Sequence, residues 1–291
     1  MDVEQLGVVG AGFMGSGIAE SAARAGIGVT LVDADRAALD RSRRQLEASL
    51  AQAVRGGKLA AGGVEEVLDR IAHTTDVDGV ADSELVIEAV FEDLAVKTEV
   101  FRQVGEGVRP DAVIASNTSS IPIAELAAAV SGPERVLGLH FFSPVPVMKL
   151  VEIVVALDTS EATLRRARAF AEALGKQPIE TKDRSGFIVN MLLVPYLMAA
   201  VRMYEEGFAT RDDIDAGMRL GCGHPMGPLT LCDFIGLDVL YAVCNSLYEE
   251  FKRDEYAPPP LMKRMVAAGR LGRKTGRGFY DYAPQPQLTR A

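Results

Sequence analysis

The sequence predicts an α/β domain built on a parallel sheet, followed by a smaller all-α domain. Over about the first 180 of the 291 residues, short β-branched runs alternate with longer helical patterns, which is typical of βαβ units. Beyond residue 183 the pattern is helical, with no convincing strand before the tail. We therefore expect an α/β domain over residues 1–183 and an α-helical domain over residues 184–291.

The expected elements follow from these patterns. Short apolar, β-branched runs predict strands at residues 6–9, 29–32, 85–89, 113–115, 135–142, 150–155 and 177–180. Helical spacing of apolar residues predicts helices at residues 15–25, 36–54, 94–104 and 161–174. In the second domain we expect a helix at residues 191–206, with loops at residues 221–228 and 256–260.

Composition excludes several classes of protein. The net charge of -9 argues against nucleic acid as the main partner, because no basic surplus exists to neutralise phosphates. Cys222, Cys232 and Cys244 follow no metal-ligand or disulfide spacing, so we expect reduced thiols and no metal. The most apolar later stretch, residues 191–201, is too short to span a bilayer, and the N-terminal strand leaves no signal peptide. We therefore expect a cytoplasmic protein that binds no membrane.

A glycine loop at residues 10–15, GAGFMG, is the strongest local motif. It directly follows a strand and opens a helix, as in dinucleotide-binding βαβ units. Gly10 permits the tight turn, Gly12 lets a pyrophosphate approach the backbone, and Gly15 lets helix and strand pack closely. The helix N-terminus supplies N–H groups and a favourable dipole for the phosphates. The first domain is therefore predicted to be Rossmann-like.

Asp33 indicates which dinucleotide is bound. It ends the second expected strand, eighteen residues after Gly15, where a carboxylate can accept hydrogen bonds from the adenosine ribose. The same carboxylate would repel the 2′-phosphate of NADP, so the sequence favours NAD. Arg36 lies close by and could soften that preference, although a solvated arginine at a helix start is the alternative.

His140 is the main catalytic candidate among the three histidines. It ends an apolar strand at the edge where open α/β sheets hold ligands, and Glu152 begins the next strand twelve residues later. Neighbouring strand ends could bring the two side chains into hydrogen-bond contact. A carboxylate that is hydrogen-bonded to one imidazole nitrogen fixes the tautomer of the ring and raises the basicity of the other nitrogen. That nitrogen can then act as the base that removes a hydroxyl proton. A core or surface histidine is the alternative, and we expect His73 and His224 to be structural.

Two further polar sites have open interpretations. Small polar side chains crowd residues 115–120, which follow another expected strand. This loop could cap the helix that begins near Pro122, or it could line the nicotinamide or the reacting oxygen. Asn190 similarly could be only the cap of the helix at residues 191–206. Spacing alone decides neither case.

The ordered motifs resemble the 3-hydroxyacyl-CoA dehydrogenase family, in particular its stand-alone 3-hydroxybutyryl-CoA dehydrogenase type, almost end to end. They are the glycine loop, residues 115–120, GLHFF at 138–142, residues 144–152, Asp183 with GFIVN at 186–190, HPMGP at 224–228 and KTGRGFY at 274–280. The resemblance implies a Rossmann-like domain with a helical dimerisation domain, a homodimer, and NAD as cofactor. It also implies a short-chain 3-hydroxyacyl-CoA substrate and a place in fatty-acid metabolism.

The resemblance also implies roles for individual residues. The family's catalytic histidine and its acidic partner correspond to His140 and Glu152, and its polar residues on the substrate side correspond to Ser119 and Asn190. Ser49 matches a position associated with the CoA moiety. The implied cofactor contacts are Gly10, Gly12, Gly15, Asp33, Glu92, Lys97, Ser119, Ser143 and Lys274.

Two positions depart from the family pattern. Ser143 stands where many members carry asparagine, so its contact near the nicotinamide is expected to be weaker or water-mediated. Gly56 stands where a basic residue is expected seven positions after Ser49. Arg55 and Lys58 are nearby candidates for the CoA phosphates, with a solvated helix end as the equal alternative.

The implied mechanism leaves two competing classes of function. Under the resemblance, His140 removes the 3-hydroxyl proton while a hydride leaves C3, and Glu152 orients His140. A dehydrogenase of the same fold that acts on a free hydroxy acid or sugar acid is the alternative enzyme. A cofactor-binding protein without useful catalysis is the other class, and the pairing of His140 with Glu152 speaks against it.

Overall fold

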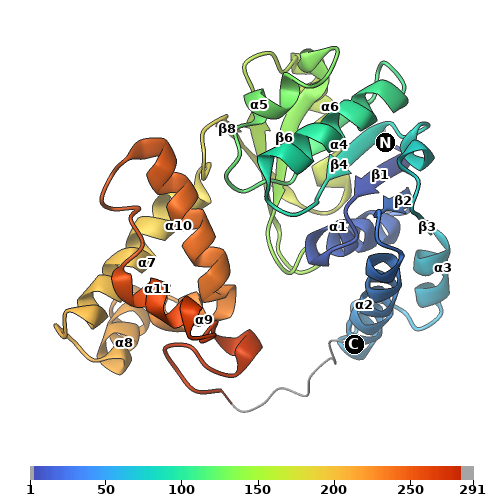
Figure 1. Cartoon of the computed structure of the whole chain (residues 1–291). Coiled ribbons are helices and arrows are strands. Elements are labelled where there is room, and N and C mark those ends of the chain that lie inside the picture. The colour runs from blue at the N-terminus through green and yellow to red at the C-terminus, as the bar shows by residue number, and fades with distance from the viewer. Residues whose placement is uncertain (1–2, 283–291) are drawn as a thin grey trace. The chain divides into compact units, whose positions relative to one another are not determined.

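The computed structural model describes residues 3–282. The chain divides into two compact units between Arg184 and Ser185. Each unit has a hydrophobic core of its own, which surrounds a sheet in the first unit and lies among helices in the second (Figure 1). The fold class is the one that the sequence predicts, an α/β Rossmann-like unit and an all-α unit.

An eight-stranded sheet organises the first unit, in the order β3-β2-β1-β4-β5-β6-β7-β8 (Figure 1). Its strands are β1 (Gln5–Val9), β2 (Gly28–Val32), β3 (Ile71–Thr74), β4 (Leu85–Glu88), β5 (Val113–Ser116), β6 (Val136–Phe141), β7 (Leu150–Val155) and β8 (Gln177–Lys182). The strands from β3 to β6 run parallel, and every residue of β4, β5 and β6 is buried. Strands covered on both faces have continuous apolar runs, which is why the sequence indicated them clearly.

Strand β7 runs antiparallel to β6, a direction that the sequence patterns did not specify. The cause is the length of the connection. Only residues 142–149 join the two strands, whereas parallel neighbours need a crossover of about a dozen residues or more. Strand β8 then returns parallel to β7 through α6 (Glu161–Ala173).

Six helices accompany the sheet: α1 (Phe13–Arg24), α2 (Arg36–Arg55), α3 (Gly63–Asp69), α4 (Leu94–Gly107), α5 (Ile123–Ala127) and α6. Asp35 and Asp93 begin α2 and α4, since each carboxylate accepts a hydrogen bond from a first-turn N–H group. The sequence patterns did not delimit β3 or α3. Each contains one buried residue, Ile71 or Val67, and therefore shows no apolar periodicity.

Up to residue 282, where the described part ends, the second unit has five α-helices: α7 (Val189–Glu205), α8 (Arg211–Cys222), α9 (Pro228–Ile235), α10 (Leu237–Phe251) and α11 (Pro260–Ala267). Leu197, Leu229, Leu240 and Leu247 lie in their shared core. Among the residues described, no single helix has both the length and the apolar composition to cross a membrane. The bent pair of α9 and α10, at 97°, passes that test only when the two are joined.

Asp233 in α9 forms hydrogen bonds with the backbone of the segment that follows α11. Its side chain is 1% exposed and accepts hydrogen bonds from the N–H groups of Phe279 at 2.9 Å and Tyr280 at 3.0 Å. We expect Asp233→Ala to lower the free energy of unfolding by about 2–3 kcal/mol, because it leaves buried donors without an acceptor. Asp281→Ala is the control, since its exposed ion pair with Arg277 contributes at most about 1 kcal/mol. Urea unfolding measures both; equal losses would contradict this role for Asp233.

Candidate active site

Three glycines shape the turn between β1 and α1. Gly10 has a φ of 109°, and a Cβ atom there would lie 2.6 Å from the carbonyl group of Ala89. A Cβ atom on Gly15 would come within 1.8 Å of the Gly10 oxygen, so only glycine allows this approach of helix and strand. A Cβ atom on Gly12 would meet no described atom within 4 Å. The backbone at Gly12 therefore faces open space that a phosphate group can enter.

The surroundings of this turn fit a dinucleotide. Within residues 3–282, no side chain caps α1, so its first N–H groups remain for an anion. At the end of β2, the Asp33 carboxylate accepts hydrogen bonds from Ala11 N–H at 2.8 Å and Asp35 N–H at 2.9 Å, one on each oxygen. Each oxygen keeps a second lone pair for a ribose hydroxyl. A cavity of about 690 Å³ beside Asp33 extends between the glycine loop and α4.

His140 and Glu152 face each other across the antiparallel ladder of β6 and β7. The expected contact is present: His140 Nδ1 lies 2.7 Å from Glu152 Oε2. The other ring nitrogen, Nε2, lies 3.0 Å from Ser119 Oγ. His140 is 4% exposed and Glu152 is fully buried.

The contacts of the imidazole assign its tautomer. A carboxylate only accepts, so Nδ1 carries the proton that is donated to Glu152. Nε2 then has the lone pair and accepts from the hydroxyl group of Ser119. A base with its lone pair held next to a serine hydroxyl can exchange a proton with a substrate oxygen at the same place.

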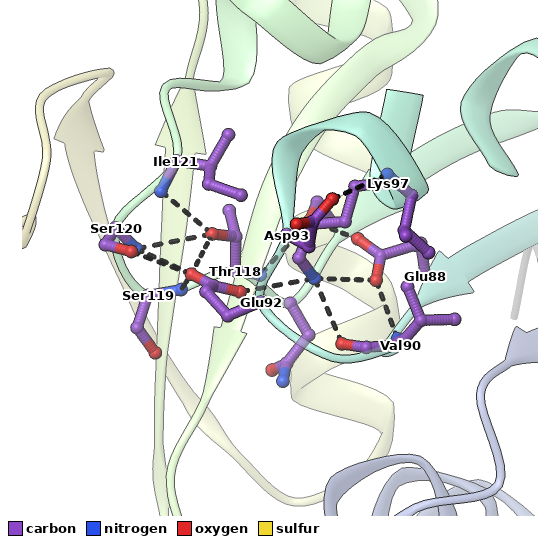
Figure 2. Close-up of polar contacts among 12 residues, drawn as sticks. Glu88, Val90, Glu92, Asp93, Lys97, Thr118, Ser119, Ser120 and Ile121 are labelled. Atoms are coloured by element: carbon purple, nitrogen blue, oxygen red, sulfur yellow. Dashed lines mark hydrogen bonds and ion pairs between the residues drawn. The ribbon is translucent and has the colours of Figure 1, made fainter. Parts of the chain in front are cut away.

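Glu92 organises the loop that carries Ser119 (Figure 2). One of its oxygens, Oε1, accepts hydrogen bonds from Ser119 N–H at 3.0 Å, Ser120 N–H at 3.1 Å, and the hydroxyl groups of Thr118 and Ser120 at 2.5 and 2.9 Å. Burial works to raise the pKa of Glu92, but Lys97 and these hydroxyl groups together lower it below its usual value. An ionised Glu92 therefore holds the backbone of this loop.

Two residues near the site, Asn117 and Asp183, lie in motifs that the sequence analysis noted but to which it assigned no role of their own. Asn117 Oδ1 accepts a hydrogen bond from Phe141 N–H at 2.9 Å and so joins the loop to the end of β6. Asp183 accepts from the N–H groups of Ile123 and Ala124 at 2.8 and 2.7 Å and caps α5. The loop at residues 115–120 therefore does not cap this helix, which was one of its two interpretations. A capping residue sixty positions away leaves no local sequence signal.

The remaining implied residues of the first unit have different settings. Lys97 is 1% exposed and forms ion pairs with Glu88 and Glu92, and its implied cofactor contact stays a prediction. Ser143 is exposed, and Ser49 is half-buried. Both are within reach of solvent.

Asn190 and Lys274 belong to the second unit. Asn190 is the second residue of α7, whose N-cap position is Ile188, so the interpretation of Asn190 as the cap is wrong. Lys274 Nζ pairs with the Asp238 carboxylate at 2.5 Å, and both side chains are about 40% exposed. Asn190 thus lies in the first turn of α7, and the side chain of Lys274 is held by an ion pair within the second unit.

A dinucleotide-binding sheet with a histidine–glutamate pair beside its carboxyl edge is typical of a nicotinamide-dependent dehydrogenase. Models of the 3-hydroxyacyl-CoA dehydrogenase NAD binding domain and C-terminal domain match residues 5–184 and 186–282. The chain therefore belongs to the 3-hydroxyacyl-CoA dehydrogenase family, and its first unit is an NAD-binding domain.

Individual relatives agree with this assignment. A 3-hydroxybutyryl-CoA dehydrogenase of Mycobacterium tuberculosis is 53% identical over 96% of this chain and 99% of its own length. The crystal structure of M. tuberculosis FadB2 has a TM-score of 0.95 and 53% identity, over 97% of this chain and 100% of that one. That of (S)-3-hydroxybutyryl-CoA dehydrogenase PaaH1 from Ralstonia eutropha has a TM-score of 0.91 and 44% identity, over 97% and 100%.

Removal of the Asp33 side chain should weaken NADH binding about 10- to 100-fold, because hydrogen bonds to a charged group contribute about 1.5–3 kcal/mol. Titration of NADH fluorescence with Asp33→Ala measures this change. Asp40→Ala removes an exposed carboxylate from α2, the helix that follows Asp33, and should leave the affinity unchanged. Equal NADH affinities in the two variants would exclude Asp33 from the ribose site.

Proposed function

We propose that this protein interconverts (S)-3-hydroxyacyl-CoA and 3-oxoacyl-CoA with NAD, and that it favours short chains such as 3-hydroxybutyryl-CoA and acetoacetyl-CoA. The observation that carries the proposal is the alignment of Glu152, His140 and Ser119 beside an NAD-binding sheet. Family membership and 3-hydroxybutyryl-CoA dehydrogenase relatives support this choice of substrate.

His140 is the proposed general base. Its Nε2 atom takes the proton of the 3-hydroxyl group as the C3–H bond breaks, and returns it in the reverse direction. Bound NAD⁺ supplies the acceptor for the hydride. Glu152 accepts the hydrogen bond from the Nδ1–H group throughout, so it keeps the ring oriented and stabilises the imidazolium as it forms. Ser119, whose hydroxyl group lies 3.0 Å from Nε2, is assigned to the same substrate oxygen as His140.

The other implied residues have proposed roles on the ligands. We assign Gly10, Gly12, Gly15 and Asp33 to NAD phosphates and ribose, as their geometry allows. Ser143 and Glu92 are assigned to the nicotinamide side and Lys274 to a further cofactor contact. In the second unit, Asn190 is assigned to the substrate thioester side. Ser49 is assigned to the CoA moiety, with Arg55 or Lys58, both exposed, as the cation for its phosphates.

We also propose a cytoplasmic homodimer that acts in fatty-acid metabolism, with residues 1–183 as the NAD-binding domain and 184–291 as the dimerisation and substrate domain. Exposed apolar side chains on the helical unit, among them Leu192, Phe208 and Leu220, support dimerisation, because burial of such groups drives association. Three free cysteines, two of them buried, suit a reducing compartment.

Oxidation of NADH with acetoacetyl-CoA and with free acetoacetate, compared side by side, tests the substrate. We expect turnover of the thioester with a kcat/KM at least about a hundredfold above that of the free acid, since the CoA moiety contributes binding energy. Better turnover of the free acid, or of neither compound, would overturn the proposed substrate and leave the NAD-binding domain in place.

Substitution of the base tests the mechanism. His140→Gln should lower kcat by roughly 10²–10⁴-fold, which is the usual contribution of a general base. Glu152→Gln should lower kcat by a similar order, because an amide no longer fixes the tautomer. His73→Gln is the control and should keep kcat within about twofold, as expected of a residue outside the site. A tenfold or smaller loss in His140→Gln would remove His140 from this role.

A further inference from the structure

A buried ion pair lies beside the loop that carries Ser119, with Glu92 between the pair and the loop (Figure 2). Glu88 ends β4, Lys97 lies in the first turns of α4, and Lys97 Nζ is 2.7 Å from Glu88 Oε1. Both side chains are 1% exposed. A buried pair of this kind contributes little net stability compared with apolar residues of the same size, so its presence calls for another explanation.

The ammonium group of Lys97 has three oxygen neighbours inside the protein. It donates hydrogen bonds to Glu88 Oε1 at 2.7 Å and to the carbonyl oxygen of Val90 at 3.2 Å, and it forms an ion pair with Glu92 Oε2 at 3.3 Å. Glu92 receives this charge on one oxygen while its other oxygen holds the loop. Lys97 therefore connects the end of β4 with the residue that organises Ser119.

Glu88 reaches the same loop from its other end. Its Oε1 atom accepts from Val90 N–H at 2.7 Å, and its Oε2 atom accepts from the Ser116 hydroxyl group at 2.6 Å. Ser116 Oγ in turn accepts from Thr118 N–H at 3.1 Å. Both ends of the segment that leads to Ser119 are thus held by one carboxylate–ammonium pair.

We propose that Glu88 and Lys97 are positioning residues that hold the loop at residues 116–120 through Ser116 and Glu92, and thereby place Ser119 against His140. What they set is the contact of 3.0 Å between Ser119 Oγ and His140 Nε2. The inference rests on the proposed function, because it assigns these residues to the same catalytic base.

The charges of the cluster explain why each partner is needed. Without Lys97, the carboxylates of Glu88 and Glu92 would face each other with no cation between them. Burial already raises the pKa of Glu88 despite Lys97, Ser116 and Val90, so Glu88 depends on this cation for its charge. A protonated Glu92 would also hold the N–H groups of the loop less strongly. Loss of either partner should therefore displace Ser119.

Stability and catalysis can be separated with a double variant. Lys97→Met and Glu88→Gln each leave a buried group without its partner and should lower the Tm. The double variant Glu88→Gln/Lys97→Met replaces both charges with neutral groups and should recover most of that loss. Glu92 still lacks its cation there, so kcat for acetoacetyl-CoA should stay at least about tenfold below wild type, as expected for a displaced catalytic contact.

A matched control has a buried cation at the opposite end of β6. Arg135 is 9% exposed and donates to the carbonyl groups of Gly105 and Arg109 at 3.0 and 3.2 Å. Arg135→Met should lower the Tm, and kcat should stay within about twofold of wild type, because additive effects are expected for distant sites. Recovery of kcat together with Tm in the double variant, or full activity in both single variants, would overturn the positioning role.

The pH profile supplies a second readout. The charged groups that face Glu92 are Lys97 from α4 and Glu88 from β4; the neighbouring Asp93 caps α4. Lys97 holds the pKa of Glu92 low, so its removal raises that pKa, and the acid limb of kcat/KM should move to higher pH in Lys97→Met. An unchanged acid limb in a folded Lys97→Met protein would contradict the proposal.

A third readout does not depend on the substrate. The ¹⁵N resonance of His140 Nε2 reports its hydrogen bond with Ser119 and should shift in the double variant but not in Arg135→Met. If wild-type protein fails to reduce acetoacetyl-CoA while this shift is seen, the proposed function is wrong and the positioning role stands. If wild-type protein is active and the resonance is the same in all variants, the positioning role is wrong.

Discussion

A short antiparallel ladder holds the proposed catalytic pair together, because β6 and β7 pair in a register that sets His140 opposite Glu152. Side chains of directly opposite residues lie on the same face of a sheet, within reach of one another. A slip by one residue would turn one of the two side chains to the other face. All of β6 and the central residues of β7 are buried, so the packing of the core on both faces prevents such a slip. The geometry of the base is therefore a consequence of the core.

The same edge of the sheet gathers the groups around the base. The carboxyl ends of β4, β5 and β6 are neighbours, and the loops after β4 and β5 bring Glu92 and Ser119 to His140. The glycine turn after β1 opens at this edge as well. Parallel pairing thus brings the cofactor turn and the catalytic groups to one edge of the sheet. In our proposal, the buried ion pair of Glu88 and Lys97 positions the loop at residues 116–120 at this edge.

Features that depend on one short segment of the chain could be predicted from the sequence, whereas most contacts between different elements could not. The glycine turn, the carboxylate of Asp33 and the continuous apolar strands are features of short segments, and the structure has them where the sequence indicated. The contact of His140 with Glu152 was expected and is present, whereas the sequence patterns did not specify the direction of β7. Glu88 appeared as one acid at the end of an apolar strand. Its partner Lys97 is on another element, so a contact between them has no signal in either segment alone.

The tautomer of His140 tests the central claim most directly, since it reports whether Glu152 orients the base. The chain has three histidines, so ¹⁵N spectra of histidine-labelled protein are simple, and His140→Gln identifies the signals of His140. At a pH where the ring is neutral, we expect a protonated Nδ1 and an unprotonated Nε2, with loss of this preference in Glu152→Gln. A proton on Nε2 in the wild-type protein would contradict the account, because the lone pair would then face Glu152 and could not accept a substrate proton.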